Sequence, residues 1–263
     1  PMVGWQRIVF PLFTYGVVIL ANLTLLVVVV ISFLKTNGPV LQPGFSLDSY
    51  RQVFRVVRAA IGNSFVFSTT ALLLIILCGS LIGYLLTRRD SAFTRFLDAL
   101  LMIPYVIPGT VLGIAFIVAF NQPPLYITGT ALIIIIAYFI RRLPYTVRSS
   151  ASIIHQIDPS VEEASINLGV PPVKTFYKIM APLMLPGILA GATLSWVTTI
   201  NEISATIVLY VGSTLTMPIA TYAEVYTGNF GPAAAVASLL ILATTVALVL
   251  FHLLGGRRGG MTL

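Results

Sequence analysis

The chain has 263 residues, of which 57% are hydrophobic and 9% are charged, and its mean hydropathy is +0.98. Soluble domains carry about 25% charged residues, so this composition excludes a soluble protein and indicates that most of the chain lies in lipid. The formal net charge of +7 does not indicate nucleic acid as a partner, because Lys and Arg stand in short clusters between apolar runs, as membrane topology requires. We therefore predict a polytopic membrane protein.

Six apolar runs are candidates to cross a bilayer, which takes roughly 20 residues, and the fourth is the shortest and runs into Arg141 and Arg142. In chain order the six runs are Val9–Leu34, Ala60–Thr87, Phe96–Phe120, Thr130–Leu143, Ile179–Tyr210 and Pro232–Leu254. The fifth run is the longest and contains Asn201 and Glu202, so we expect it to be tilted or broken. The predicted fold class is an all-α membrane protein with six transmembrane helices. Residues 1–58 would hold the first span and an outer interfacial helix, and residues 59–263 a five-span core with a cytoplasmic loop at 146–178.

The distribution of Lys and Arg predicts the orientation of the spans, because positive residues concentrate in cytoplasmic loops. If the N-terminus is cytoplasmic, most of them fall inside: Arg7, Arg88, Arg89, Arg95, Arg141, Arg142, Arg148, Lys174, Lys178, Arg257 and Arg258. The remaining four fall outside: Lys35, Arg51, Arg55 and Arg58. Both termini are therefore expected in the cytoplasm.

The outer segment Phe45–Arg58 has the pattern of an amphipathic helix. Tyr50, Phe54 and Val57 recur at helical spacing, with basic residues between them. A helix of this kind lies in the membrane interface, with its apolar face toward lipid and its basic residues toward water and phosphates.

The cytoplasmic loop at 146–178 contains a short predicted helix with a well-marked start. Asp158 is a good N-cap and Pro159 suits the first helical position. Glu162 and Glu163 fall in the first turn, where the positive end of the helix dipole favours acidic side chains. The segment is therefore expected to be ordered, although it connects two spans.

The same helix has an equally clear end. Gly169 suits the left-handed residue that terminates a helix, and the two prolines after Val170 prevent its continuation. One face is small and apolar, and consists of Val161, Ala164, Ser165 and Leu168. The helix is too short and too acidic to enter lipid, so this face must contact protein. The residues alone leave open whether that protein is the rest of this chain or another subunit.

The spacing of these residues resembles the EAA motif of permease subunits of binding-protein-dependent ABC importers. It reads Glu163-Ala-Ser-x-x-x-Gly169, followed after nine residues by Ile179-x-Ala-Pro182, with Ser165 and Ala181 in place of the usual Ala and Leu. The segment Asn201–Thr206 is similar to the ferric-iron branch of this family and its phosphonate, thiamine and polyamine relatives.

This resemblance implies a permease subunit of an ATP-driven importer in the inner (plasma) membrane, with ferric iron or a phosphonate-like anion as substrate. It implies that the short helix is a coupling helix that docks into an ATPase. The docking residues would be Asp158, Glu162, Glu163, Ala164, Ser165, Leu168, Gly169, Ile179 and Pro182. The implied partners are an ABC ATPase dimer, which would bind ATP and Mg, a second permease half on the same or another chain, an extracytoplasmic substrate-binding protein and membrane lipid. No cofactor is expected in this chain.

Glu202 is a carboxylate inside the fifth apolar run, where a charge facing lipid is costly. It either lines the translocation path or braces the span against Arg141 or a backbone amide, and the sequence leaves both interpretations open. Two prolines interrupt the third run, where ordinary bending is favoured over a kink beside a pore. The candidate path residues are Asn201, Glu202, Ser204, Pro104 and Pro108.

The sequence lacks the machinery of an enzyme. It has no phosphate-binding Gly-x-x-x-x-Gly-Lys-Ser/Thr loop, no nucleophile elbow and no spaced set of metal ligands, and the single Cys78 lies in an apolar run where packing is the preferred interpretation. The energy for transport must then come from a partner. The alternative is an ion-coupled secondary transporter or a channel, but ion coupling needs several buried ionisable groups, and Glu202 is almost alone.

Overall fold

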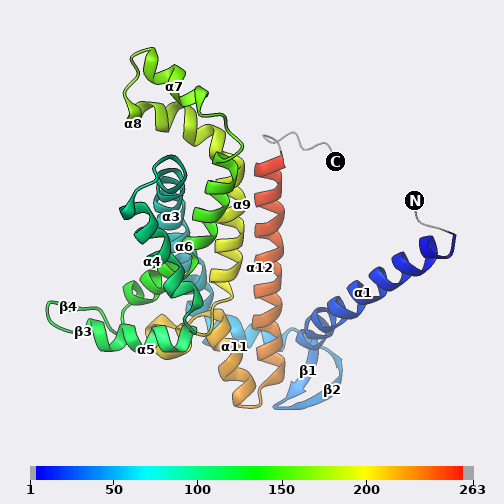
Figure 1. The fold of residues 1–263 in the computed structure, drawn as a ribbon. Helices are drawn as coiled ribbons and strands as arrows, with labels where there is room; N and C mark the ends of the chain where they lie inside the picture. Colours follow the sequence, from blue (N-terminus) through cyan, green and yellow to red (C-terminus); the bar gives the residue numbers. More distant parts are fainter. Residues whose placement is uncertain (1–3, 257–263) are drawn as a thin grey trace. The chain divides into compact units, whose positions relative to one another are not determined.

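The computed structural model describes residues 4–256, which are mainly α-helical (Figure 1). The chain divides into two compact units. The first combines the chain up to Arg58 with Met217–Leu242, and the second combines Ala59–Thr216 with the chain from Ala243 onward. Arg257 and Arg258, which contribute to the predicted orientation, lie outside the described residues.

In the first unit, the other elements follow or pack near the end of the long helix α1 (Gln6–Ser32). These elements are β1 (Leu34–Asn37), β2 (Val40–Phe45), α2 (Asp48–Val56), α11 (Met217–Tyr226) and the first part of α12 (Phe230–Gly256). The hydroxyl groups of Ser32 and Tyr50 are hydrogen-bonded at 2.8 Å, which joins the end of α1 to α2. At the start of α12, a Cβ on Gly231 would lie 2.6 Å from the Ser49 Oγ. Glycine therefore lets α12 begin directly against α2.

Helix α2 lies within the segment predicted as an outer helix, and its buried residues only partly coincide with the predicted apolar face. Val53 and Val57 are buried together with Ser49, whereas Phe54 is exposed. The buried residues are spaced by four, so they lie on one side of the helix. Arg51 and Arg55 are exposed, as an interfacial helix would require.

The second unit holds the remaining elements. They are α3 (Arg58–Arg88), α4 (Ala92–Val106), α5 (Gly109–Phe120), β3 (Asn121–Gln122), β4 (Leu125–Tyr126), α6 (Ala131–Ile154), α7 (Ser160–Asn167), α8 (Pro172–Thr175), the π-helical segment η1 (Phe176–Met180), α9 (Ala181–Ile200), α10 (Thr206–Leu209) and the 3₁₀ turn η2 (Gly212–Thr214). Two short hairpins, β1–β2 and β3–β4, depart from the all-α prediction.

Helix α6 forms the centre of the second unit, and its neighbours approach it through glycines. A Cβ on Gly83 of α3 would lie 2.9 Å from the Val147 carbonyl oxygen, and one on Gly191 of α9 would lie 2.6 Å from the Thr146 Cα. Small residues permit this close backbone packing, which is typical of helices in lipid. The helix also continues to Ile154, well into the segment 146–178 that the sequence predicts as a loop.

Four helical stretches are long and apolar enough to cross a membrane. They are Gln6–Ser32, Arg58–Arg88, Pro172–Ile200 and Phe230–Leu253. The pair α4 and α5 adds a fifth if it is taken as one bent span. Length and composition alone therefore identify four to five of the six predicted spans. Helix α6 corresponds to the fourth predicted span, and it carries Arg141, Arg142 and Arg148 along its length.

The third predicted span is bent far more sharply than expected. Helices α4 and α5 meet at an angle of 109°, whereas ordinary proline bending was favoured from the sequence. The break is at Ile107 and Pro108, which both have extended backbone. Proline has no N–H for the helix ladder and disfavours a helical conformation in the residue before it. Pro104, in contrast, lies inside α4.

The fifth predicted span is broken, as expected. Helix α9 ends at Ile200, and the chain is irregular through Asn201–Ala205 before α10 begins. Glu202 lies in this break. The helical stretch also begins earlier than predicted, at Pro172, because α8 and η1 lead directly into α9.

Candidate functional site

Helix α7 begins beside Asp158, whose Oδ1 accepts a hydrogen bond of 2.8 Å from the Ser160 backbone N–H. This bond satisfies one of the amide groups that a helix start leaves free. The same bond lowers the pKa of the exposed Asp158 carboxyl. Because the pKa is lower in the folded state, the cap contributes at neutral pH and is lost only as the pH falls through that lowered value.

Gly169 ends α7 in the left-handed conformation, with φ of 82°. The Gly169 N–H donates to the Ile166 carbonyl at 2.8 Å, and the Val170 N–H donates to the Ser165 carbonyl at 3.2 Å. This pair of bonds is the Schellman motif, which satisfies the last carbonyl groups of a helix. The role expected of Gly169 as a helix terminator is thus present in the structure.

Glu162 attaches α7 to the end of α3. The Tyr84 hydroxyl donates to Glu162 Oε1, and Arg88 Nε lies 3.4 Å from Glu162 Oε2. Arg88 also donates through Nη2 to the Ile157 carbonyl at 3.1 Å. The side chains of Arg88 and Glu162 are only 15% and 16% exposed, so solvent screens this ion pair much less than one at the surface. Helix α7 is therefore fixed to a long helix through a carboxylate.

The two sides of α7 differ in their surroundings. Ser165 is buried, and its hydroxyl shares a hydrogen bond of 2.9 Å with that of Thr175. Glu163, Ala164 and Leu168 are exposed, and Leu168 is 84% exposed. The predicted small apolar face is thus divided, because Ser165 turns inward while its neighbours turn outward. The outward side presents the Glu163 carboxylate and several apolar side chains, of which Leu168 is the most exposed.

The last two predicted docking residues lie away from α7. Ile179 belongs to η1 and is half-buried, and Pro182 is exposed in the first turn of α9. Pro182 also lines an apolar groove between α3 and α9. The motif residues are therefore distributed over two consecutive structures, the short helix and the start of the next span.

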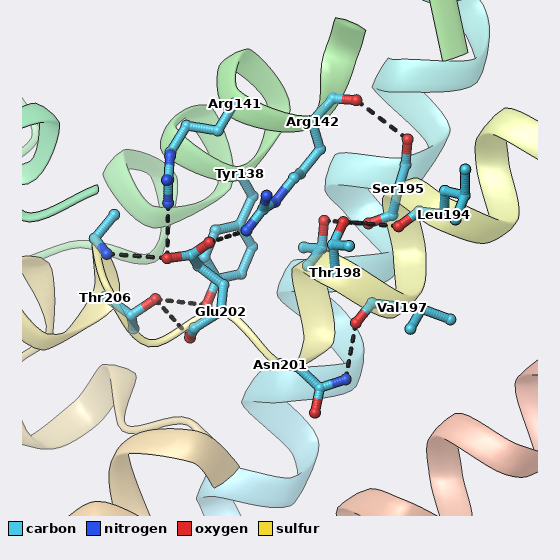
Figure 2. A network of polar contacts seen from close by, with 12 residues as sticks. Tyr138, Arg141, Arg142, Leu194, Ser195, Val197, Thr198, Asn201, Glu202 and Thr206 are labelled. Atoms are coloured by element: carbon cyan, nitrogen blue, oxygen red, sulfur yellow. Dashed lines mark hydrogen bonds and ion pairs between the residues drawn. The ribbon is translucent and has the colours of Figure 1, made fainter. Parts of the chain in front are cut away.

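Glu202 forms the centre of a buried ion cluster, which Figure 2 shows. Its side chain is 3% exposed. Arg141 Nη1 lies 2.8 Å from Glu202 Oε1, and Arg142 Nη2 binds Glu202 Oε2. The Ala205 backbone N–H donates to Oε1 at 3.0 Å. The carboxylate thus holds the break after α9 against α6 through the two arginines, and the amide hydrogen bond orders the break itself.

Within residues 4–256, the other candidate path residues form no hydrogen bond or ion pair with the Glu202 carboxylate. Asn201 points away from it (Figure 2), and its side-chain amide donates to the Val197 carbonyl at 2.8 Å. Ser204 is exposed, and its Cβ lies 2.6 Å from where a Cβ on Gly109 would be. Gly109 follows Pro108, so the two breaks lie against each other. Pro104 is half-buried in α4.

Sequence reasoning missed several residues of these two sites. Arg142 contributes as directly as Arg141, and Tyr138 extends the cluster because its hydroxyl is bonded at 2.8 Å to that of Thr206. The sequence did contain a signal for Arg142, because two adjacent arginines at the end of an apolar run need an acidic partner. Tyr84 and Arg88 gave no such signal, because their distance from Glu162 depends on how α3 and α7 pack.

The family of binding-protein-dependent transport system inner membrane components matches residues 75–259. The chain belongs to this family. The matched region includes α7, the EAA-like residues and the Glu202 cluster, so the sites described above lie within the family region.

Individual relatives of this inner membrane component are named for different substrates. The chain is 35% identical over 189 residues to the ferric transport system permease protein FbpB of Actinobacillus pleuropneumoniae, which is 72% of this chain but 27% of that protein. It is 24% identical to the putative 2-aminoethylphosphonate transport system permease protein PhnV of Salmonella paratyphi A, over 90% of both chains. The chain thus spans about a quarter of the ferric relative and most of the phosphonate one.

Solved structures of similar fold come from bacterial ABC transporters. A transporter that imports the acidic polysaccharide alginate contains a chain with a TM-score of 0.72 and 17% identity, covering 98% of this chain and 96% of the other. An inward-facing structure of the MetNI methionine transporter gives a TM-score of 0.61 and 18% identity, covering 78% and 95%. At these identities the likeness establishes the fold of this inner membrane component.

Proposed function

We propose that this chain is one permease half of an ATP-driven importer, with α7 as the helix that docks into the ATPase. The observation that carries the proposal is the family membership together with the position of α7, which is anchored to α3 through Glu162 and exposes Glu163 and Leu168 on its other side. A short helix held firmly on one side and exposed on the other is suited to transmit a movement of a docked partner to the spans.

The chain crosses the membrane six times in this proposal. The spans are α1, α3, the bent pair α4 and α5, α6, the stretch from α8 to α9, and α12. Helix α6 is included because each of its arginines has an acidic partner: Arg141 and Arg142 share the buried Glu202, and Arg148 pairs with Asp98 at 2.9 Å in a more exposed position. The two arginines that share Glu202 are 12% and 16% exposed, so they face the protein interior and not lipid.

Both termini lie in the cytoplasm in this arrangement. The clusters of basic residues at the α7 side support it, because Arg88, Arg89, Lys174 and Lys178 are all near one end of α3 or at the start of α8 and η1. The β1–β2 hairpin and α2 then belong to the outer side, where a binding protein would deliver the substrate.

ATP and Mg are bound by the partner ATPase, and a second permease half completes the path. When the ATPases close on ATP, they would displace α7, and Glu162 would transmit that displacement to α3 through Tyr84 and Arg88. The permease would then change access from outside to inside. A ferric ion or a phosphonate-like anion is the proposed substrate, since relatives over the family region are named for these two.

Site-specific cross-linking tests the proposal. Cys78 is first replaced by Ala, and a single cysteine is then placed at Leu168 in the tagged chain and cross-linked in native membranes. The linked protein, identified by mass spectrometry, should carry an ATP-binding phosphate loop. The control is a cysteine at Phe54, which is also exposed and apolar but lies in the first unit. If the chain is correctly inserted and the cysteine at Leu168 does not cross-link to an ATPase, the proposal is refuted. That result would favour an ion-coupled transporter or a channel.

Uptake measurements in whole cells then separate the two substrates. Cells that express the complete system are given radiolabelled ferric iron or 2-aminoethylphosphonate, with and without the chain. The substrate whose uptake depends on the chain is the transported one. If the uptake of neither compound depends on the chain, both are excluded as substrates.

A further inference from the structure

The surface between α3 and α9 contains an open apolar groove of about 800 Å³. This volume is in the range of about 300–1,000 Å³ that is typical of ligand sites. The groove is lined by Leu73, Ile76, Leu77, Ser80, Tyr177, Ala181, Pro182, Leu183, Leu185, Pro186 and Ile188. All of these residues belong to the second unit, so the groove is formed within one compact part of the chain.

The walls of the groove are exposed although they are apolar. Leu77 on the α3 side is 63% exposed and Tyr177 on the α9 side is 62% exposed. The floor is different, because Ile188 is buried and packs in the cluster that also contains Ile76 and Ala181. A groove with a packed apolar floor and exposed apolar walls on membrane-spanning helices is suited to hold an acyl chain.

The end of the groove nearest α7 is basic. Lys174 in α8 lies three residues before the lining residue Tyr177, and Lys178 in η1 lies three and four residues before Ala181 and Pro182, at the start of the stretch that continues into α9. Side chains in a helix lean toward its N-terminus, so both lysines extend toward the α7 end of the groove. Within residues 4–256, neither lysine forms an ion pair, and both are exposed.

We propose that this groove binds an anionic phospholipid of the cytoplasmic leaflet, with an acyl chain between α3 and α9 and the phosphate headgroup against Lys174 and Lys178. Charge complementarity selects this occupant, because two unpaired lysines and an interfacial tyrosine at the mouth of an apolar groove match a negatively charged headgroup above a hydrocarbon chain. The lipid would fill the space beside η1, where the chain passes from the α7 segment into α9. The inference depends on the proposed orientation, which puts this end of the groove at the cytoplasmic surface.

The test compares lipid retained by the intact complex after purification in mild detergent and reconstitution in vesicles of phosphatidylglycerol or phosphatidylcholine. Lys174→Gln with Lys178→Gln should reduce the preference for phosphatidylglycerol about 30-fold, since each basic group near the surface contributes on the order of 1 kcal/mol and about 1.4 kcal/mol corresponds to tenfold. Leu77→Trp should reduce retention of both lipids by filling the groove. Native mass spectrometry and lipid chromatography give the readout.

The control is Arg51→Gln with Arg55→Gln, which removes two exposed basic residues of the same spacing from α2, outside the lining of the groove. It should lower the preference for phosphatidylglycerol much less than the double lysine variant does. Unchanged phosphatidylglycerol preference in the double lysine variant would overturn the proposal, and so would a cross-link that places α1 of either permease copy in the groove. Loss of the Leu168 cross-link to an ATPase, with lipid selectivity intact, would instead count against the proposed function alone.

Discussion

The Tyr84 hydroxyl donates a hydrogen bond to the Glu162 carboxylate, and this bond ties a helix of eight residues to one of 31 residues. Arg88 adds an ion pair to the same carboxylate. The contact explains why one glutamate of the first turn of α7 turns inward while Glu163 stays exposed. It also gives the most direct route from the proposed ATPase contact to a membrane span.

Tyr84→Phe should weaken this attachment while it leaves the ring packed. A hydrogen bond to a charged group contributes about 1.5–3 kcal/mol, so α7 should become more mobile and ATP hydrolysis should proceed with less uptake. The ratio of transport to hydrolysis in proteoliposomes measures the effect. Glu163→Gln is the control for the outward side and should change ATPase binding rather than the mobility of α7. Full coupling in Tyr84→Phe would contradict the proposed route.

Gly169→Val should destabilise the end of α7 through the backbone alone. A Cβ at this position would meet nothing within 4 Å, so the cost of about 1–2 kcal/mol comes from the left-handed conformation. Proteolysis of the α7 segment should become faster, and co-purification of the ATPase should fall. Gly169→Asn is the control, because asparagine adopts this conformation more readily, and it should retain most of the assembly. Equal behaviour of the two variants would show that the backbone conformation is unimportant here.

Glu202→Gln should mainly lower stability. Removing one partner from a buried ion pair costs about 3–5 kcal/mol, and here two arginines would lose their shared carboxylate. Thermal unfolding of the purified chain, followed by fluorescence-detected size exclusion, should show a marked loss. Asn201→Ala, at the adjacent exposed position, should have a small effect. Normal stability combined with lost uptake would instead indicate that the carboxylate acts in the translocation path.

Gly109→Ala should strain the contact between the two broken spans. A Cβ there would lie 2.6 Å from Arg141 Nη1 and 2.6 Å from the Ser204 Cβ, so a side chain of the ion cluster must move, and overpacking of this kind costs about 1–3 kcal/mol. Gly62→Ala is the matched control in α3, since nothing lies within 4 Å of its Cβ position, and it should be neutral or stabilising by about 0.5–1 kcal/mol. Equal melting temperatures for the two variants would contradict the tight contact.

Cysteine labelling from outside intact cells should follow the proposed orientation. With Cys78 replaced, a cysteine at Gln42 in β2 should react with an impermeant thiol reagent, while one at Ser160 should react only after the cells are opened. Both positions are exposed, so access to the reagent and not burial decides the result. The reverse pattern would invert the topology.

The sequence predicted best those features that depend on residues close together in the chain. Gly169 ends its helix as expected, because a left-handed terminator followed by prolines is a local signal, and the break at Glu202 followed from a charge in an apolar run. The side of α7 that turns inward was not predictable, since Ser165 meets Thr175 only once α8 packs against α7, and Glu162 meets Tyr84 only once the distant helix α3 has packed. Pro108 similarly signalled a break, but its angle depends on the contact of Gly109 with the turn at Ser204.

The glycine contacts of α6 predict which helices move together. Because Gly83 and Gly191 bring the backbones of α3 and α9 onto α6, we expect these three helices to move as one unit. Helical hydrogen bonds beside them are interrupted at Ile107–Pro108 and at Asn201–Ala205, so these two breaks are candidate hinges. They contact each other at Gly109 and Ser204, so we expect a displacement that begins at α7 to change both breaks together.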